Sequence, residues 1–129
     1  IGINDVWRQF DVPAISEAAV MPQEYESNME EMILKIKDNV KGIFIISPYY
    51  IEVNKEDYMR KRMDEYVEIC KKLAKKYSLY FVDFQKTFED FCKIQHSSKL
   101  AWDRVHPNRM GAMLQAKEFA KHIDFDFNR

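Results

Sequence analysis

The sequence predicts an α/β fold in which helices cover both faces of a parallel sheet. Two short, continuous apolar runs, residues 43–46 and 79–82, are typical of strands that are buried on both faces. Segments with apolar residues at helical spacing surround and separate these runs, and strands that alternate with helices favour parallel pairing. At 129 residues, the chain is one domain or part of one.

Two long helices are predicted, one before the first strand in the sequence and one after it. The earlier helix covers residues 23–39 and ends before Gly42, a helix stop signal. Its apolar stripe consists of Tyr25, Met29, Met32, Ile33, Ile36 and Val40. The later helix begins at Asp57 and continues for about five turns. Its apolar stripe consists of Met59, Met63, Tyr66, Val67, Cys70, Leu73, Ala74 and Tyr77.

The remaining segments before the last helix show shorter patterns. Residues 1–10 are predicted to be the end of a strand followed by a loop, and residues 11–23 a second loop with a short helix at 16–20 as an option. A further short helix is predicted to begin at Thr87, after a turn that the Asp83 carboxylate caps.

The last helix is predicted to follow residues 102–108, which read Trp-Asp-Arg-Val-His-Pro-Asn. Pro107 suits the first helical position, because its fixed φ and missing N–H carry no penalty there. The apolar residues beyond it are expected to form one buried stripe on the helix. They are Met113, Ala116, Ala120 and Ile123. Trp102 is expected to pack beside the loop.

Composition excludes several classes of protein. The net charge of −1 offers no broad basic field, so no nucleic-acid partner is expected. No apolar run approaches the roughly 18 residues of a transmembrane helix, so no membrane span is expected. Cys70 and Cys92 do not form a disulfide framework of the kind that small secreted domains use, which predicts reduced thiols in a cytoplasmic protein.

Asp103 and His106 are the candidate catalytic residues. They lie three positions apart in the loop before the last helix, so the carboxylate can accept the N–H of one imidazole nitrogen. This contact would fix the tautomer and leave the other nitrogen free as a general base. Two alternatives are open: the residues act only as cap and surface polar groups, or they belong to a metal site, for which two ligands are too few.

A second motif lies at the start of the chain, where residues 2–5 read Gly-Ile-Asn-Asp. Together with Asp103 and His106, in this order and with an α/β pattern between, it resembles the SGNH (GDSL) hydrolase family. That family has a Gly-x-Asn-Asp block and, just before its last helix, an Asp-x-x-His block. The proline, asparagine and glycine that follow His106 also match residues common at that place in the family.

The resemblance implies a three-layer α/β/α, flavodoxin-like parallel sheet. The family's Gly-Asp-Ser block, which carries the nucleophile, is absent from residues 1–129, and so is the block whose glycine supplies another oxyanion donor. We therefore expect residues 1–129 to be the C-terminal portion of a single SGNH hydrolase domain, with its first strands missing from this chain. The expected partner is the missing N-terminal segment of the same domain.

The activity that the resemblance implies is ester hydrolysis by acyl transfer, as in GDSL-type lipases and esterases. A serine upstream of Ile1 would attack the ester carbonyl, and His106 would take its proton. Asp103 would orient His106, and Asn4 would donate to the oxyanion. No metal and no organic cofactor is needed. Small-molecule or carbohydrate esters, including O-acetyl carbohydrates, are the expected substrates.

Three aromatic residues are candidates for the wall of a substrate pocket, namely Trp7, Tyr49 and Trp102. Each of them follows or precedes a segment that the prediction places at the carboxyl edge of the sheet, where ligands bind in open α/β folds. Packing explains Trp7 and Tyr49 equally well.

Other nucleophiles and another function class are open. Ser47 follows a strand, but Pro48 argues against a nucleophile elbow, which needs a helix directly behind the serine. A thiol hydrolase that uses Cys70 or Cys92 is disfavoured, because both thiols are expected to be buried. A non-catalytic binding or structural module that keeps the SGNH fold also fits the missing serine.

Overall fold

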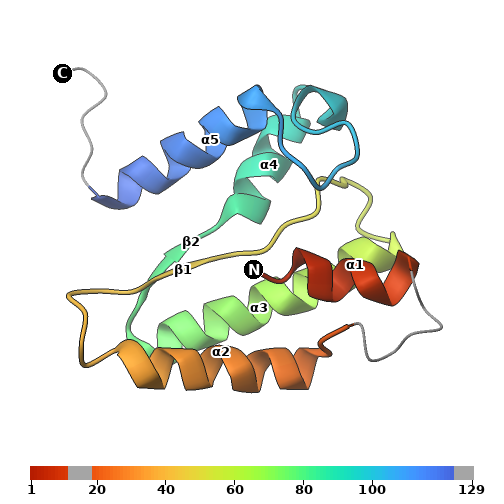
Figure 1. Cartoon of the computed structure of the whole chain (residues 1–129). Helices are drawn as coiled ribbons and strands as arrows, with labels where there is room; N and C mark the ends of the chain where they lie inside the picture. The colour runs from red at the N-terminus through yellow and green to blue at the C-terminus, as the bar shows by residue number, and fades with distance from the viewer. Residues whose placement is uncertain (12–18, 124–129) are drawn as a thin grey trace.

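Residues 1–11 and 19–123 are described by a computed structural model, in which helices lie on both sides of a two-stranded sheet (Figure 1). The strands β1 (Phe44–Ile46) and β2 (Tyr80–Val82) pair in parallel, with Ile45 opposite Phe81. The helices are α1 (Ile3–Asp11), α2 (Pro22–Ile36), α3 (Tyr58–Tyr77), α4 (Phe84–Cys92) and α5 (Arg109–Ala120), with 3-10 turns at Ser97–Lys99 and Lys121–Ile123. The predicted α/β class with parallel strands is confirmed.

Alternate strand residues face two different helical layers. Ile45 and Phe81 belong to a core cluster shared with α1, α2 and α3. Phe44 and Val82 belong to a second cluster, shared with α4, α5 and the loop between them. Both strands are therefore covered on two faces, as their continuous apolar runs predict.

The helices that follow the strands begin at aspartate caps. The start of α3 directly after Asp57 is as predicted. The Asp83 carboxylate accepts the backbone N–H three residues further on, at 2.9 Å, which confirms the predicted cap. The helix after it nevertheless begins at Phe84 and not at Thr87. Phe84 and Phe88 are both buried one turn apart, so the first turn is held by packing as well as by the cap.

Residues 3–11 form α1, so the prediction of a strand end and a loop over residues 1–10 is wrong. Ile3, Val6 and Phe10 recur at helical spacing, but Val6 is the one buried residue of the helix, and so short a pattern fits either period. Gly2 precedes the helix with a φ of 120°, a conformation that favours glycine, and a Cβ there would lie 2.9 Å from Pro48. The optional helix at 16–20 falls mostly outside the described residues.

The last helix begins at Arg109, with Asn108 as its cap. The Asn108 side-chain oxygen accepts the N–H of Met110 at 2.9 Å and that of Gly111 at 3.2 Å. Pro107 therefore precedes the cap, and the prediction that it is the first helical residue is wrong.

The predicted buried stripe on α5 is also wrong, although Ala120 is buried. Its exposed members are Met113, Ala116 and Ile123. The helix packs instead through Gly111 at its start, where a Cβ would lie 2.8 Å from the carbonyl oxygen of Leu100, and through Phe119 near its end. The Phe119 ring lies 5.2 Å from that of Phe44 in β1. These two contacts determine which side of the helix faces the sheet.

Candidate active site

Asp103 and His106 form a closed turn in the loop before α5. Asp103 Oδ2 lies 2.6 Å from His106 Nδ1. The other carboxylate oxygen, Oδ1, accepts the backbone N–H of Val105 at 3.0 Å and that of His106 at 2.8 Å. The hydrogen bond from the His106 side chain, followed by those from the backbone, lowers the pKa of the Asp103 carboxyl to about 2. This carboxylate is therefore ionised at neutral pH and fixed at both oxygens.

The imidazole is held on one side and open on the other. The His106 side chain is 72% exposed. Within the described part of the chain, Nδ1 has Asp103 as its partner and Nε2 has none. With the Nδ1 proton donated to the carboxylate, Nε2 carries the free lone pair of a neutral imidazole. The geometry provides a histidine base that faces solvent.

The alternative that Asp103 is a helix cap does not fit this geometry. The cap of α5 is Asn108, and Asp103 binds the backbone of its own turn and the His106 ring. Among the described residues, no group of three His, Cys, Asp or Glu side chains is placed to hold a metal ion.

Helix α1 lies beside the Asp103–His106 turn. The Trp7 ring centroid is 5.8 Å from that of His106, with the two planes tilted by 59°. Asn4 lies one turn before Trp7 on α1 and is exposed, and residues three apart on a helix are neighbours on its surface. Arg8 pairs with Asp11 at 2.5 Å and stays at the surface. The structure thus brings Trp7 to the side of the imidazole, with Asn4 one turn earlier on the same helix.

The other predicted pocket residues differ in their surroundings. Trp102 is 93% exposed, so the prediction that it packs beside the loop is wrong. Tyr49 is half-buried, with its ring 4.8 Å from that of Phe88 in an edge-on contact. Burial, the largest cause, raises the pKa of Tyr49, and the nearby Asp103 charge raises it further. Tyr49 is therefore part of the packed layer close to Asp103.

Neither Ser47 nor the two thiols are placed as nucleophiles. Ser47 is buried, and its Oγ accepts the backbone N–H of Gln85 at 3.2 Å. Cys70 is buried as predicted and lies 3.3 Å from the Tyr25 hydroxyl. Cys92 is half-buried rather than buried. Burial raises the pKa of both thiols, which keeps them in the less reactive protonated form.

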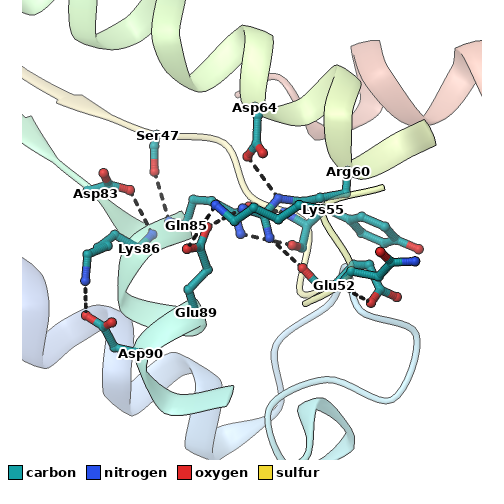
Figure 2. A network of polar contacts seen from close by, with 12 residues as sticks. Ser47, Glu52, Lys55, Arg60, Asp64, Asp83, Gln85, Lys86, Glu89 and Asp90 are labelled. Carbon is teal, nitrogen blue, oxygen red and sulfur yellow. Dashed lines mark hydrogen bonds and ion pairs between the residues drawn. The ribbon is translucent and has the colours of Figure 1, made fainter. Parts of the chain in front are cut away.

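A buried polar network, which the sequence patterns did not predict, supports the segment after β1 (Figure 2). Its centre is Arg60 on α3, which is 0% exposed and whose guanidinium reaches Asp64 at 2.9 Å, Glu89, and the backbone oxygen of Glu52 at 2.5 Å. Arg60 lies one turn before the buried Met63, and a charged residue on the buried stripe of a helix is the signal that predicts such a network.

The parallel α/β fold, the Asp103–His106 pair and the asparagine on α1 together define a protein of the SGNH hydrolase class. The chain belongs to the GDSL-like lipase/acylhydrolase family, whose family model matches residues 1–114. The resemblance carried by the two short motifs is thereby confirmed. Across the described ranges, no helix combines the length and apolar character needed to cross a bilayer.

Known proteins resemble this chain over nearly all of its length. An acetylxylan esterase of Geobacillus stearothermophilus is 43% identical over 129 residues, which is 100% of this chain and 59% of that protein. The crystal structure of Axe2, an acetylxylan esterase from the same organism, superposes with a TM-score of 0.95 at 44% identity, covering 98% of this chain and 57% of that one. LAE5, an α/β hydrolase from the metagenome of Lake Arreo, superposes with a TM-score of 0.92 at 42% identity. This match covers 94% of this chain and 56% of LAE5.

The chain therefore spans less than two thirds of the length of these relatives. Further structures of Axe2 are described as catalytic mutants, in which a serine, an aspartate or a histidine is replaced by alanine. In that esterase the aspartate and the histidine lie three positions apart, and the serine lies near the N-terminus.

Proposed function

We propose that the protein is an ester hydrolase that removes acyl groups from small-molecule or carbohydrate esters, O-acetyl carbohydrates above all. The observation that carries the proposal is the 2.6 Å contact between Asp103 and His106 Nδ1, which leaves Nε2 exposed. The 43% identity to an acetylxylan esterase supports a carbohydrate ester as the substrate.

In the proposed reaction, His106 Nε2 takes the proton of a serine hydroxyl as the serine oxygen attacks the ester carbonyl. The proton then passes to the leaving alcohol, and water repeats the sequence on the acyl-enzyme. Asp103 stays ionised, because its pKa is about 2, and it stabilises the imidazolium that forms. Asn4 donates a side-chain N–H to the oxyanion from α1, one turn before Trp7.

The serine of this proposal lies outside residues 1–129, and we assign these residues to the C-terminal portion of a single domain. Ser47 is buried and already accepts a hydrogen bond, so it is a poor candidate. In Axe2 the serine of the catalytic mutant precedes the aspartate and histidine by most of the chain, and their spacing there equals that of Asp103 and His106. The free thiols Cys70 and Cys92 support a reducing, cytoplasmic location.

The free edge of β1 supports a further segment of the same domain as the partner of this chain. Among the described residues, β1 pairs with β2 alone, and its other edge borders an apolar groove of about 290 Å³. The groove is lined by Ile1, Met29, Met32, Ile33, Ile36, Ile43, Phe44, Ile45 and Ile46. An unpaired strand edge beside apolar side chains is suited to pairing with another strand.

Two tryptophans are proposed to contact the substrate. Trp7 lies beside the imidazole, where it can close one side of the acyl site. Trp102 directly precedes Asp103 and exposes nearly its whole ring, and such rings supply a large apolar contact surface. Tyr49 is proposed to form the inner wall below them.

The test is His106→Ala in the complete protein, assayed with an activated acetyl ester and with an acetylated oligosaccharide. Loss of the general base should lower kcat by about 10⁴-fold or more, while the KM changes little. His122→Ala changes a histidine in the 3-10 turn after α5; it is the matched control and should keep full activity. Full turnover by the His106 variant would refute the mechanism. A wild-type protein without esterase activity would leave the non-catalytic module as the better function.

A further inference from the structure

Arg104, in the middle of the Asp103–His106 turn, has an unusual backbone conformation. Its φ is 65°, and in the described part of the chain the other non-glycine residue with a positive φ is Ser78. Ser78 ends α3, where a left-handed residue is common. Arg104 ends no helix, so its conformation depends on the hydrogen bonds that Asp103 makes within the turn and on contacts from outside it.

Two contacts tie Arg104 to the segment that follows β1. Its backbone oxygen accepts the N–H of Ile51 at 2.9 Å. Its guanidinium Nη1 donates to Glu52 Oε2, while the other oxygen of that carboxylate accepts the N–H of Asn54 at 2.8 Å. The backbone and the side chain of Arg104 are therefore held from the same short segment.

That segment is itself fixed by buried polar side chains (Figure 2). Arg60 donates to the backbone oxygen of Glu52 at 2.5 Å. The buried Gln85 binds both backbone groups of Tyr50, accepting the N–H at 2.8 Å and donating to the carbonyl at 3.2 Å. A chain of contacts thus runs from α3 and α4 through Glu52 to the turn.

Most surface ion pairs contribute little, so it matters that one partner of this pair, Glu52, is largely buried. The Glu52 side chain is 14% exposed, although that of Arg104 is 47% exposed. The Tyr50 hydroxyl and the Glu52 carboxylate both raise the pKa of the Arg104 guanidinium. Glu52 therefore acts as a fixed acceptor, to which the more exposed arginine is tied.

Resting on the proposed function, we infer that Glu52 is a positioning residue: its ion pair with Arg104 holds the turn that aims His106. Both N–H groups that Asp103 Oδ1 accepts, those of Val105 and His106, follow directly after Arg104. A change in the φ of Arg104 would rotate them away and loosen the carboxylate that fixes the imidazole tautomer.

The experiment uses Glu52→Gln in the complete protein, because glutamine keeps the shape and an oxygen for Asn54 but lacks the charge. The kcat should fall by roughly 10–10²-fold, the scale of a small misplacement of a reacting group, with the KM changed less than about twofold. The ¹⁵N shifts of His106 at pH 8 should show a smaller share of the tautomer that is protonated on Nδ1. Arg104→Lys, which keeps the charge without the planar fork, should give a smaller change in both.

The matched control is Glu65→Gln, which breaks another glutamate–arginine pair, with Arg62 at 2.8 Å on the exposed side of α3. It should move neither the kcat nor the tautomer share. An unchanged tautomer share in Glu52→Gln, or an equal change in the control, would overturn the inference. The tautomer measurement needs no turnover, so it decides the role of Glu52 even if the wild-type protein hydrolyses no ester.

Discussion

At Asp103, a single carboxylate accepts three hydrogen bonds within one turn of chain. Oδ1 closes the turn and Oδ2 holds the imidazole, so both carboxylate oxygens already serve as acceptors. Asp103→Asn replaces one of these acceptors by an NH₂ donor, which must face either the backbone N–H groups or His106 Nδ1. The kcat should fall by roughly 10²–10⁴-fold through loss of the correct tautomer, with some activity left. Esterase kinetics of the complete protein measure this, and wild-type activity in the variant would contradict it.

The low pKa of Asp103 predicts how the turn responds to acid. The carboxyl titrates at about 2 in the folded chain, below the ordinary 3.8. The folded state gains stability from the charged carboxylate at pH values above 3.8, and this gain is lost as the pH falls through about 2. A ¹³C titration of the carboxyl should therefore show a midpoint well below 3.8.

The His106→Ala variant supplies the control for this titration. In the wild-type protein, the hydrogen bond from the His106 side chain is the largest cause of the lowered pKa of Asp103. Removing this side chain should therefore move the midpoint of the Asp103 titration toward 3.8. A wild-type midpoint near 3.8 would show that the hydrogen bonds to Asp103 are not maintained in solution.

Asn4 is an exposed residue of α1, one turn from Trp7. If it donates to the oxyanion, Asn4→Ala should lower kcat by roughly 10²–10³-fold and leave KM nearly unchanged. Asn28→Ala removes an exposed helical asparagine from α2 and should have no effect. A raised KM with an unchanged kcat would mean that Asn4 binds the ground-state substrate instead.

Short motifs predicted the contact at the centre of the site but not what supports it. The spacing of Asp103 and His106 confines their contact to a few covalently linked residues, so the sequence suffices to predict it. The conformation of Arg104 depends on Glu52, which is distant in sequence, and the buried Arg60 reaches Glu89 from another helix. Contacts between distant segments leave no periodic pattern in the sequence. The one feature that indicated such contacts is Arg60, a charged residue on the buried stripe of α3.

At the scale of helices and strands, a long helix such as α3 was easier to predict from the sequence than a short one such as α1. The twenty-residue α3 repeats its apolar pattern over several turns and was predictable at its start. α1 has nine residues and one buried side chain, too few to distinguish a helix from a strand end. On α5 the apolar residues suggested a stripe, but close approach at Gly111 rotates the helix so that Met113 is 60% exposed.

The packing of the start of α5 depends on the absence of a side chain at Gly111. A Cβ there would lie 2.7 Å from Pro107 and 2.8 Å from the backbone oxygen of Leu100, which cannot move easily. Alanine favours a helix over glycine by about 1 kcal/mol, but overpacking typically costs about 1–3 kcal/mol. Gly111→Ala should therefore lower the free energy of unfolding by up to about 2 kcal/mol in urea denaturation of the complete protein.

Gly42→Ala is the matched control for this change. Its Cβ would lie 3.3 Å from the exposed Tyr80 ring, which can shift at little cost, so stability should change far less than in Gly111→Ala. Equal losses in the two variants would show that close approach at Gly111 does not position α5.

Across the whole molecule, a set of polar contacts lies beyond the carboxyl ends of the strands, and several exposed apolar side chains lie along the free edge of β1. Beyond their carboxyl ends, Gln85 and Arg60 hold the segment after β1 (Figure 2), and that segment holds the turn of Asp103 and His106. Along the free edge of β1 the side chains are apolar and several are exposed, including Met32 and Ile46. The proposed site is thus braced from within residues 1–129, whereas the sheet edge is not.

This difference predicts the behaviour of residues 1–129 expressed alone. The unpaired edge of β1 and the apolar groove beside it should drive association or aggregation, and the isolated chain should not melt cooperatively as a monomer. Ile46→Lys places a charge on this edge and should reduce association in sedimentation experiments. Val53→Lys, at an apolar residue that is exposed outside the groove, should leave association unchanged. A compact wild-type monomer with a sharp thermal transition would show that two strands suffice, and ester hydrolysis by that monomer would place a nucleophile within residues 1–129.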